Sequence, residues 1–447
     1  MPPKSIQLSP FQLIVFFYFS TVTLSAILLS LPVAHKPETE WSFIDALFTA
    51  VSAVSVTGLT VVSTADTFST TGIFLLAIVL QIGGVGIMAL STLVWLLFGK
   101  KIGLKERQLI MADQNRMALA GLVRLMKQIL ILILLIELIG TLILGTYFLT
   151  VFPTWQEAFY HAFFAAVSAT TNAGFDITGA SLEPFAHDYF VQFIVILLII
   201  LGSIGFPVLI EVKDFLMNKK SDLPYRFSLF TKLTTVTFFS LVAVGFLLIL
   251  FLELNHFFKG QTWHEVLFFS LFQSVTTRSA GLSTMDVGEF SEATQLVLSF
   301  LMFIGASPSS TGGGIRTTTF AIILLAIFFF AKGNESIKVF NREIHHEDII
   351  KAFVVLSVAI LLCATAVVML ALMEDLPLIS IIFEVSSAFG TCGLSMGITD
   401  DLSTTGKTII MFLMFFGRVG LVPLLFLIRG KGVSDKYHYP KERVIIG

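Results

Sequence analysis

Eight long apolar stretches constrain the fold of this chain more than any other feature of the sequence. A helix needs about 20 mostly apolar residues to cross a bilayer, and each stretch is close to that length or longer. Only 13% of the 447 residues are charged and 55% are hydrophobic, whereas soluble proteins carry roughly 25% charged residues. The sequence therefore predicts an all-α polytopic membrane protein with eight transmembrane helices. The stretches are Phe11–Leu31, Gly72–Phe98, Leu122–Val151, Tyr189–Ile210, Leu229–Leu254, Thr294–Phe330, Ile349–Met373 and Lys407–Ile428.

Basic residues gather in alternate segments between these stretches. Most of the 28 Lys and Arg residues precede the first stretch or follow the second, fourth, sixth and eighth. Cytoplasmic segments of membrane proteins carry such an excess, so we expect a multi-pass protein with both termini in the cytoplasm. The carboxylates favour the opposite segments, and this has two interpretations. These segments are ordinary polar loops, or they form an anionic vestibule that raises the local concentration of cations.

A short apolar segment rich in Ser and Thr recurs four times between the stretches. The copies read FTAVSAVSVTGL, FAAVSATTNAGF, LFQSVTTRSAGL and FEVSSAFGTCGL, with turn glycines at Gly58, Gly174, Gly281 and Gly393. Each copy is too short to cross a bilayer and lies on a predicted extracellular segment. The repeating unit is a span, a half-helix that ends near a glycine, and a second span. Four such units predict four span–pore-loop–span repeats with pseudo-fourfold symmetry.

The four glycine turns have a physical requirement. Non-helical backbone is tolerated at membrane depth only where it is buried in protein or lines a water-filled cavity. Four turns around one axis supply a ring of carbonyl oxygens that replaces the hydration shell of a cation. An interfacial hairpin explains a single copy, but four copies in register favour such a selectivity filter. Its predicted residues are Val56, Thr57, Gly58, Asn172, Ala173, Gly174, Ser279, Ala280, Gly281, Thr391, Cys392 and Gly393.

The sixth stretch is interrupted by GASPSSTGGGIR, from Gly305 to Arg316. An interior glycine costs a helix about 1 kcal/mol and a proline about 3 kcal/mol, so this segment predicts a loop within the membrane. It is either a kink for helix packing or, as we favour, a flexible gate below the filter. The predicted gate residues are Gly305, Ala306, Ser307, Pro308, Ser309, Ser310, Thr311, Gly312, Gly313, Gly314 and Arg418.

Three charged residues lie within or beside the apolar stretches. An unpaired arginine at the position of Arg418 costs at least ~2.5 kcal/mol in a bilayer, so we expect it to face the protein interior and to have a partner. It either opposes cation passage at the gate or bonds to carbonyls of the broken sixth helix. We expect Glu137 to hydrogen-bond a neighbour rather than relay protons. We expect Arg278 to point away from the pore and to pair with a carboxylate.

The sequence lacks common motifs for nucleotide binding and catalysis. It contains no G-x-x-x-x-G-K-[ST] loop, no G-x-G-x-x-G after a strand, and no H-E-x-x-H or C-x-x-C pattern. We therefore predict a protein that is not an enzyme and holds no cofactor of its own. The chain is predicted to contain four pore modules. Module 1 is 1–99, a cytoplasmic linker and module 2 are 100–218, and module 3 is 219–331 with the gating loop at 305–316. A second cytoplasmic linker and module 4 are 332–430, and a cytoplasmic tail is 431–447.

These motifs together resemble those of the Trk/Ktr/HKT superfamily of cation transporters, and they look most like the membrane subunit of a bacterial Ktr potassium-uptake system. The resemblance covers nearly the whole chain. It rests on SVTGL, TNAGF, TRSAGL and GTCGL in the four loops, and on QIGGVGIM, GKKIGLKER, IGASPSSTGGGIRTTTF and FGRVG elsewhere.

The resemblance implies potassium uptake across the bacterial plasma membrane, with the ion held by filter carbonyls. In this family glycine in all four loops accompanies potassium selectivity, and Gly58, Gly174, Gly281 and Gly393 match that pattern. It also implies a gating loop at 305–316, and a homodimer in the lipid bilayer on a cytosolic nucleotide-binding ring of RCK/KTN type, with no nucleic-acid partner. The alternatives are a symporter that couples potassium to sodium or protons, and a scaffold or receptor without transport. Sodium is a candidate activator.

Overall fold

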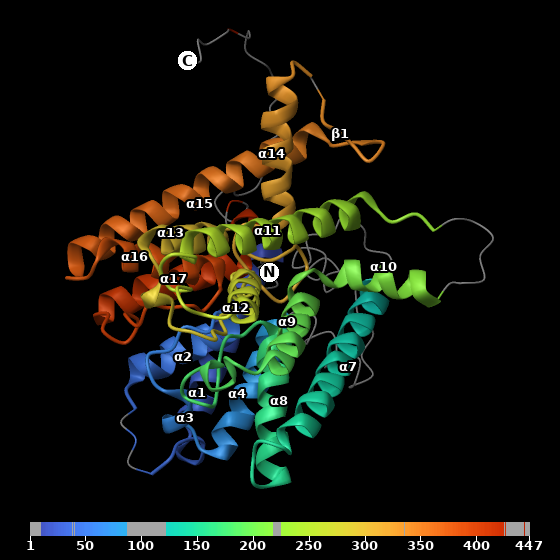
Figure 1. Ribbon diagram of the computed structural model, residues 1–447. Helices are drawn as coiled ribbons and strands as arrows, with labels where there is room; N and C mark the ends of the chain where they lie inside the picture. Colours follow the sequence, from blue (N-terminus) through green and yellow to red (C-terminus); the bar gives the residue numbers. More distant parts are fainter. Residues whose placement is uncertain are drawn as a thin grey trace, which may run out of the picture.

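The computed structural model describes residues 10–37, 39, 41–86, 122–217, 225–334, 336–423, 425 and 442. This part of the chain is helical apart from loops and one short hairpin (Figure 1), in which β1 (Lys338–Val339) pairs antiparallel with β2 (Arg342–Glu343). The all-α fold class is thereby confirmed. The second half of the stretch Gly72–Phe98, the GKKIGLKER linker and nearly all of the tail at 431–447 lie outside the described residues.

The described helices repeat one order four times: a long apolar helix, a short helix that leads into a glycine turn, and a second apolar helix. The first two repeats contain α1 (Pro10–Leu29), α2 (Phe43–Ser55), α4 (Thr70–Val85), then α7 (Leu122–Phe148), α8 (Trp155–Thr171) and α9 (Tyr189–Ser203). The last two contain α11 (Leu229–Glu253), α12 (Trp263–Thr276), α13 (Glu292–Phe303), then α15 (His346–Met373), α16 (Leu378–Gly390) and α17 (Thr404–Val419). Between and after them lie η1 (Pro32–Ala34), α3 (Thr64–Thr67), η2 (Glu183–Phe185), α10 (Phe206–Met217), η3 (Val287–Glu289) and α14 (Thr317–Ala331).

The repeats close into a ring through one kind of helix contact. The second apolar helix of each repeat packs against the short helix of the next, as α4 does on α8, α9 on α12, α13 on α16 and α17 on α2. The last of these contacts joins the fourth repeat back to the first. The four short helices are thus held around a common centre, whereas α14 projects from the bundle toward the hairpin (Figure 1).

The fourth and sixth of the eight apolar stretches are interrupted; the break in the sixth was expected, and the break in the fourth was not. Among the described helices, four are long and apolar enough to cross a membrane, and α9 with α10 makes a fifth only if the pair is counted as one span. That pair is bent by 103°, because Gly205 adopts a φ of 102° and Pro207 follows it. The stretch Tyr189–Ile210 is therefore broken, and Thr294–Phe330 is divided into α13 and α14.

Short polar residues determine where the second helices begin. Ser69, Asp188, Ser291 and Ser403 are their N-caps, and each side chain accepts a hydrogen bond from the backbone N–H three residues later. Such caps satisfy one of the four N–H groups that a helix start leaves unpaired. In the last two repeats a glutamate at the end of the long helix adds a second connection to the cap.

Glu253 and Glu374 make this connection. The Oε1 atom of the buried Glu253 accepts hydrogen bonds from Ser291 N at 3.0 Å and Ser291 Oγ at 2.6 Å, and its Oε2 accepts one from Phe257 N at 3.2 Å. Glu374 Oε1 accepts hydrogen bonds from Ser403 N at 3.2 Å and Ser403 Oγ at 2.5 Å. The carboxylates therefore fasten the two apolar helices of a repeat together at one end.

Replacing Glu253 with Ala is expected to destabilise the protein, because it leaves partly buried N–H donors at Ser291 and Phe257 without their carboxylate acceptor. A buried unsatisfied donor costs about 1–3 kcal/mol, so the Tm in detergent should fall by several degrees. Glu289→Ala removes the same charge from an exposed residue of the adjacent loop and serves as the control. Equal Tm values for the two variants would contradict the structural role assigned to Glu253.

Candidate functional site

The four short helices end in a shared backbone conformation. A non-glycine residue two positions before each turn glycine adopts a left-handed φ, at 56° for Val56, 55° for Asn172, 78° for Ser279 and 47° for Thr391. The next N–H of the first, second and fourth turns bonds to the carbonyl five residues earlier, each at 2.8 Å. This is the Schellman ending of a helix. In all four repeats the left-handed residue turns the chain sharply two residues before the glycine.

The four turn glycines approach one another so closely that no side chain fits between them. Each has a positive φ, of 92° at Gly58, 71° at Gly174, 72° at Gly281 and 98° at Gly393. A Cβ added at each would meet a carbonyl oxygen of the next repeat: 2.5 Å from Ala173 O, 3.1 Å from Ala280 O, 2.2 Å from Cys392 O and 2.2 Å from Thr57 O, in that order. These four contacts form a closed circuit. The structure thus brings together all twelve residues predicted for the filter.

Hydroxyl groups of the short helices hold the turns from behind. Ser52 Oγ accepts a hydrogen bond from Gly58 N at 3.1 Å, and Ser387 Oγ accepts one from Gly393 N at 3.0 Å. In the second repeat Ser168 Oγ donates to Phe175 O at 2.6 Å. Sequence reasoning did not single out these serines. The available signal was a serine six residues before the glycine in three of the four copies.

The ring favours positive charge. The C-terminal end of a helix carries roughly −0.5 elementary charge from its aligned peptide dipoles, and the C-terminal ends of all four short helices meet at the ring. A pocket of about 390 Å³ lies beside the first and fourth turns. It is lined by Gly58 and the residues that follow it, and by residues from Gly393 to Asp400. The arrangement suits a dehydrated cation and disfavours an anion.

Carboxylates in the loops between the helices lie close enough to influence one another. Partial burial, followed by the charges of Asp286, Glu289 and Asp176, raises the pKa of Glu183. Like charges disfavour each other's ionised form in this way. The loops near η2 and η3 therefore form an acidic surface, which is compatible with both interpretations of the carboxylates.

The segment between α13 and α14 lies against the opposite end of the turns. Asn172 Nδ2 donates a hydrogen bond to Thr311 Oγ1 at 2.6 Å, and Gly313 N donates one to Ser279 Oγ at 3.3 Å. A Cβ at Gly313 would lie 2.6 Å from Thr391 Oγ1. The loop thus contacts the left-handed residue of three turns, directly beside the ring.

The break between α9 and α10 anchors this loop. Thr311 N donates to Gly202 O at 3.2 Å and Ser307 N donates to Ser203 O at 3.1 Å, while Phe206 N donates to Ser309 O at 2.9 Å. Where a helix is interrupted, its last carbonyls lose their helical partners. The loop supplies donors to two of them, so the two breaks satisfy one another.

Arg418 connects the same loop to the first repeat. Its guanidinium donates to Thr311 O in the loop and to Gly83 O at the end of α4, with a further bond to Gly84 O at 3.3 Å. Both alternatives from the sequence fit this position, since Arg418 bonds to carbonyls and also lies at the loop. The carbonyls belong to the broken sixth stretch and to α4.

Arg278 differs from expectation. It is fully buried and donates to Ile304 O at 2.8 Å and to Leu301 O, both at the end of α13, and not to a carboxylate. The break after α13 leaves these carbonyls free, and a guanidinium satisfies two acceptors at once. Glu137 Oε2, by contrast, accepts a hydrogen bond from Gln81 Nε2 on α4, which is the kind of neighbour contact expected.

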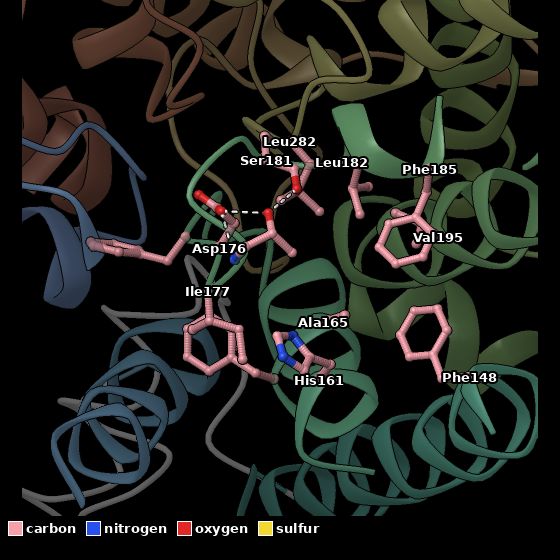
Figure 2. Close-up of a pocket in the computed structure, with 13 residues that line it drawn as sticks. Phe148, His161, Ala165, Asp176, Ile177, Ser181, Leu182, Phe185, Val195 and Leu282 are labelled. Carbon is pink, nitrogen blue, oxygen red and sulfur yellow. Dashed lines mark hydrogen bonds between the residues drawn. The ribbon is translucent and has the colours of Figure 1, made fainter. Parts of the chain in front are cut away.

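A second, mostly apolar pocket lies beside the turn of the second repeat. The rings of Phe148, His161 and Phe185 surround it, and Asp176 lies at its edge (Figure 2). The Asp176 carboxylate accepts hydrogen bonds from Thr178 Oγ1 at 2.9 Å and Gly179 N at 2.8 Å, which hold the chain after the turn. The pocket has room for water-sized groups of only about 30 Å³ in total. The ring is therefore the better candidate for an ion site.

Known proteins resemble this chain along its whole length. A family model for TrkH, described as a cation transport protein, matches residues 11–438. The Ktr system potassium uptake protein D of Bacillus subtilis is 62% identical over 445 residues, covering 99% of each chain. The potassium/sodium uptake protein NtpJ of Enterococcus hirae is 36% identical over 449 residues, covering 99% of this chain and 98% of its own.

A solved structure shares the fold. The crystal structure of the potassium transporter TrkH from Vibrio parahaemolyticus matches with a TM-score of 0.73, over 96% of this chain and 86% of that one. Sequence identity across this match is 19%, so the match supports the architecture of the repeats and no further detail.

Gly281→Ser is expected to destabilise the ring, because its Cβ would lie 2.2 Å from the backbone oxygen of Cys392. Gly260→Ser is the matched control: Gly260 has a similar φ of 89° but nothing within 4 Å of its added Cβ. Both variants incur the left-handed strain of about 1–2 kcal/mol, and only Gly281→Ser adds a clash of roughly 1–3 kcal/mol. Thermal unfolding in detergent compares them. A Tm for Gly281→Ser equal to that of Gly260→Ser would mean that the ring is not closely packed.

Proposed function

The chain belongs to the TrkH family of cation transport proteins, and we propose that it takes up potassium across the bacterial plasma membrane through the ring of four turns. The observation that carries this proposal is the closed circuit of glycine-to-carbonyl contacts among Gly58, Gly174, Gly281 and Gly393. Relatives named as potassium uptake proteins support the choice of ion.

Backbone oxygens coordinate the ion in this proposal. The side chains at the left-handed position differ among the four turns, as Val56, Asn172, Ser279 and Thr391, while the backbone course is shared. Carbonyl rings select among cations by cavity size and by the number and field strength of the oxygens. The ion is the cargo of the protein and not a resident cofactor. Sodium as an activator belongs to the same proposal, with the name of a potassium/sodium uptake relative as its support.

The loop from Gly305 to Gly314 acts as the gate. Its bonds to Asn172 and Ser279 hold it against one end of the turns, where it obstructs the path of an ion that leaves the ring. Arg418 bonds to the loop at Thr311 and adds a positive charge that opposes a cation. Opening requires the loop to give up these hydrogen bonds, so the closed state is held by several weak contacts.

A cytosolic partner controls this gate in our proposal. Two relatives are named as parts of a Ktr system, which supports a separate regulatory component such as the nucleotide-binding ring of RCK/KTN type. The protein would work as a homodimer with both termini in the cytoplasm, and the charged linkers would be the docking faces. The module boundaries at 99, 218, 331 and 430 remain part of this proposal.

A symporter that couples potassium to sodium or protons is the second candidate. The potassium/sodium uptake protein among the relatives favours it. Reversal potentials measured at varied sodium and pH distinguish the two. Uncoupled conduction depends on the potassium gradient alone, whereas a coupled transporter shifts its reversal potential with the second ion.

Rubidium uptake into proteoliposomes tests the proposed function. We expect the intact protein to take up rubidium, and we expect potassium to inhibit this uptake strongly and sodium only weakly. In Gly58→Ser, sodium should inhibit the uptake as well. The added side chain distorts one quarter of the ring, because the Cβ at Gly58 would lie 2.5 Å from Ala173 O. Gly260→Ser should keep the preference of the intact protein. Unchanged discrimination in Gly58→Ser would argue against the filter assignment, and a protein that stays inert even after deletion of Ser309–Gly313 would support a scaffold or receptor.

Deleting Ser309–Gly313 should raise the flux and make it independent of any cytosolic partner, because the deletion removes the part of the loop that contacts the turns. Arg418→Gln should act in the same direction more weakly, since it removes the charge and leaves the loop in place. The two changes act on one barrier, so their combined effect should be less than additive. The readout is flux in vesicles without partner. A deletion variant no faster than the intact protein would leave the helix-kink interpretation.

A further inference from the structure

The pocket beside the ring has a polar wall that the proposed filter does not explain. The pocket, of about 390 Å³, lies between the segments that follow two of the turn glycines. One wall belongs to the first repeat and the other to the fourth. The wall residues are Gly58, Leu59, Thr60, Val61, Val62 and Ser63 on one side, and Gly393, Ser395, Gly397, Thr399 and Asp400 on the other.

A buried carboxylate lies behind the wall of the fourth repeat. Glu384 on α16 is fully buried. Its Oε2 accepts a hydrogen bond from Ser395 Oγ at 2.9 Å, and its Oε1 accepts one from Thr399 Oγ1 at 2.5 Å. None of the ion pairs within the described residues involves Glu384. Burying an ionised carboxylate without a cationic partner is costly, so a cation held in the pocket beside it would stabilise the ionised form of Glu384.

The hydrogen bonds determine what the wall offers to a ligand. A hydroxyl group has one hydrogen and two lone pairs, and both wall hydroxyls give their hydrogen to Glu384. Only oxygen lone pairs are then left for the pocket. The two hydroxyl oxygens lie 2.9 Å apart, and Ser395 Oγ also accepts from Gly397 N at 3.1 Å. Ser395 and Thr399, which both line the pocket, therefore bring it two adjacent acceptor oxygens backed by the carboxyl group of Glu384.

We propose that this pocket is a binding site for a partly dehydrated monovalent cation, which occupies it before entering the ring. Ser395 and Thr399 supply the ligand oxygens, and Glu384 is a positioning residue that orients both hydroxyls and supplies the charge. Asp400 lines the same pocket and adds a second carboxylate. Neutral hydroxyls suit a monovalent ion better than Ca²⁺, whose sites gather several carboxylate and carbonyl oxygens. The inference rests on the proposed uptake function and extends its path beyond the filter.

Glu384→Gln tests the site in the full chain reconstituted in proteoliposomes, with rubidium as the probe. The amide keeps the size of the side chain but loses the charge, and its NH₂ group needs an acceptor, which reverses one of the hydroxyl bonds. We expect the KM for rubidium to rise about tenfold with little change in the maximal rate. Glu384→Asp, which keeps the charge, should recover part of the affinity.

Glu374→Gln is the matched control. Glu374 also accepts a hydrogen bond from a serine hydroxyl in the fourth repeat, that of Ser403, but Ser403, unlike Ser395, is not among the residues that line the pocket. Its variant should keep the KM of the intact protein. A normal KM in Glu384→Gln, or an equal rise of the KM in both variants, would overturn the proposed cation site. Rubidium uptake by the intact protein would still support the proposed function in that case. Absence of uptake both by the intact protein and by the variant that lacks Ser309–Gly313 would contradict the proposed function itself.

Thr399→Val keeps the test decisive if Glu384→Gln does not insert or fold. It removes one ligand oxygen without changing the charge, and it should raise the KM for rubidium. Asp400→Asn, which removes an exposed charge at the rim, should raise the KM mainly at low salt, because salt screens exposed charges. A normal KM for Thr399→Val, in protein recovered at the usual yield, would overturn the proposal.

Discussion

The close approach of four backbone turns is the contact on which the rest of this structure depends. At each turn a glycine faces a carbonyl oxygen of the next repeat, at a distance that leaves no room for a Cβ at Gly281 or Gly393. Such an approach needs short helices that end at the same depth, and it needs second helices that hold them from outside. The order in which α4, α9, α13 and α17 pack on neighbouring short helices meets that need. The repeats are therefore built outward from the ring.

Interrupted helices are the consequence of this construction, and their free carbonyls must be satisfied within the protein because the bilayer offers no water. Three solutions are visible. The loop after α13 donates backbone N–H groups to Gly202 and Ser203. Arg418 donates to the end of α4, and Arg278 donates to the end of α13. The two arginines that look anomalous in an apolar sequence thus serve one purpose, which is to complete the hydrogen bonding of broken helices.

The sequence predicted those features of the fold that depend on neighbouring residues in the chain. The apolar stretches predicted the long helices, and the recurring glycines located the turns, because a short half-helix with a glycine at its end has few uses in a membrane. Partners from distant segments could not be predicted. Arg278 was expected to meet a carboxylate, yet its acceptors are carbonyls that become free only because α13 ends where it does. The bend at Gly205 carried a local signal, a glycine followed by Pro207, but its apolar surroundings concealed it. The left-handed conformation of the β-branched Val56 is imposed by the ring, since the residue itself disfavours it.

The loop between α13 and α14 makes different contacts with the four turns. Asn172, Ser279 and Thr391 offer it polar side chains, but the equivalent residue of the first repeat is Val56, which has no hydrogen-bonding side chain. On that side the connection runs through Arg418, from Thr311 to Gly83. A charged group within the membrane responds to voltage, and moving one elementary charge across the full membrane potential changes the free energy by about 2.3 kcal/mol per 100 mV. In the proposed gate, any movement of the loop that displaces Arg418 along the membrane normal would do electrical work, so the balance between closed and open states would depend on the polarisation of the cell.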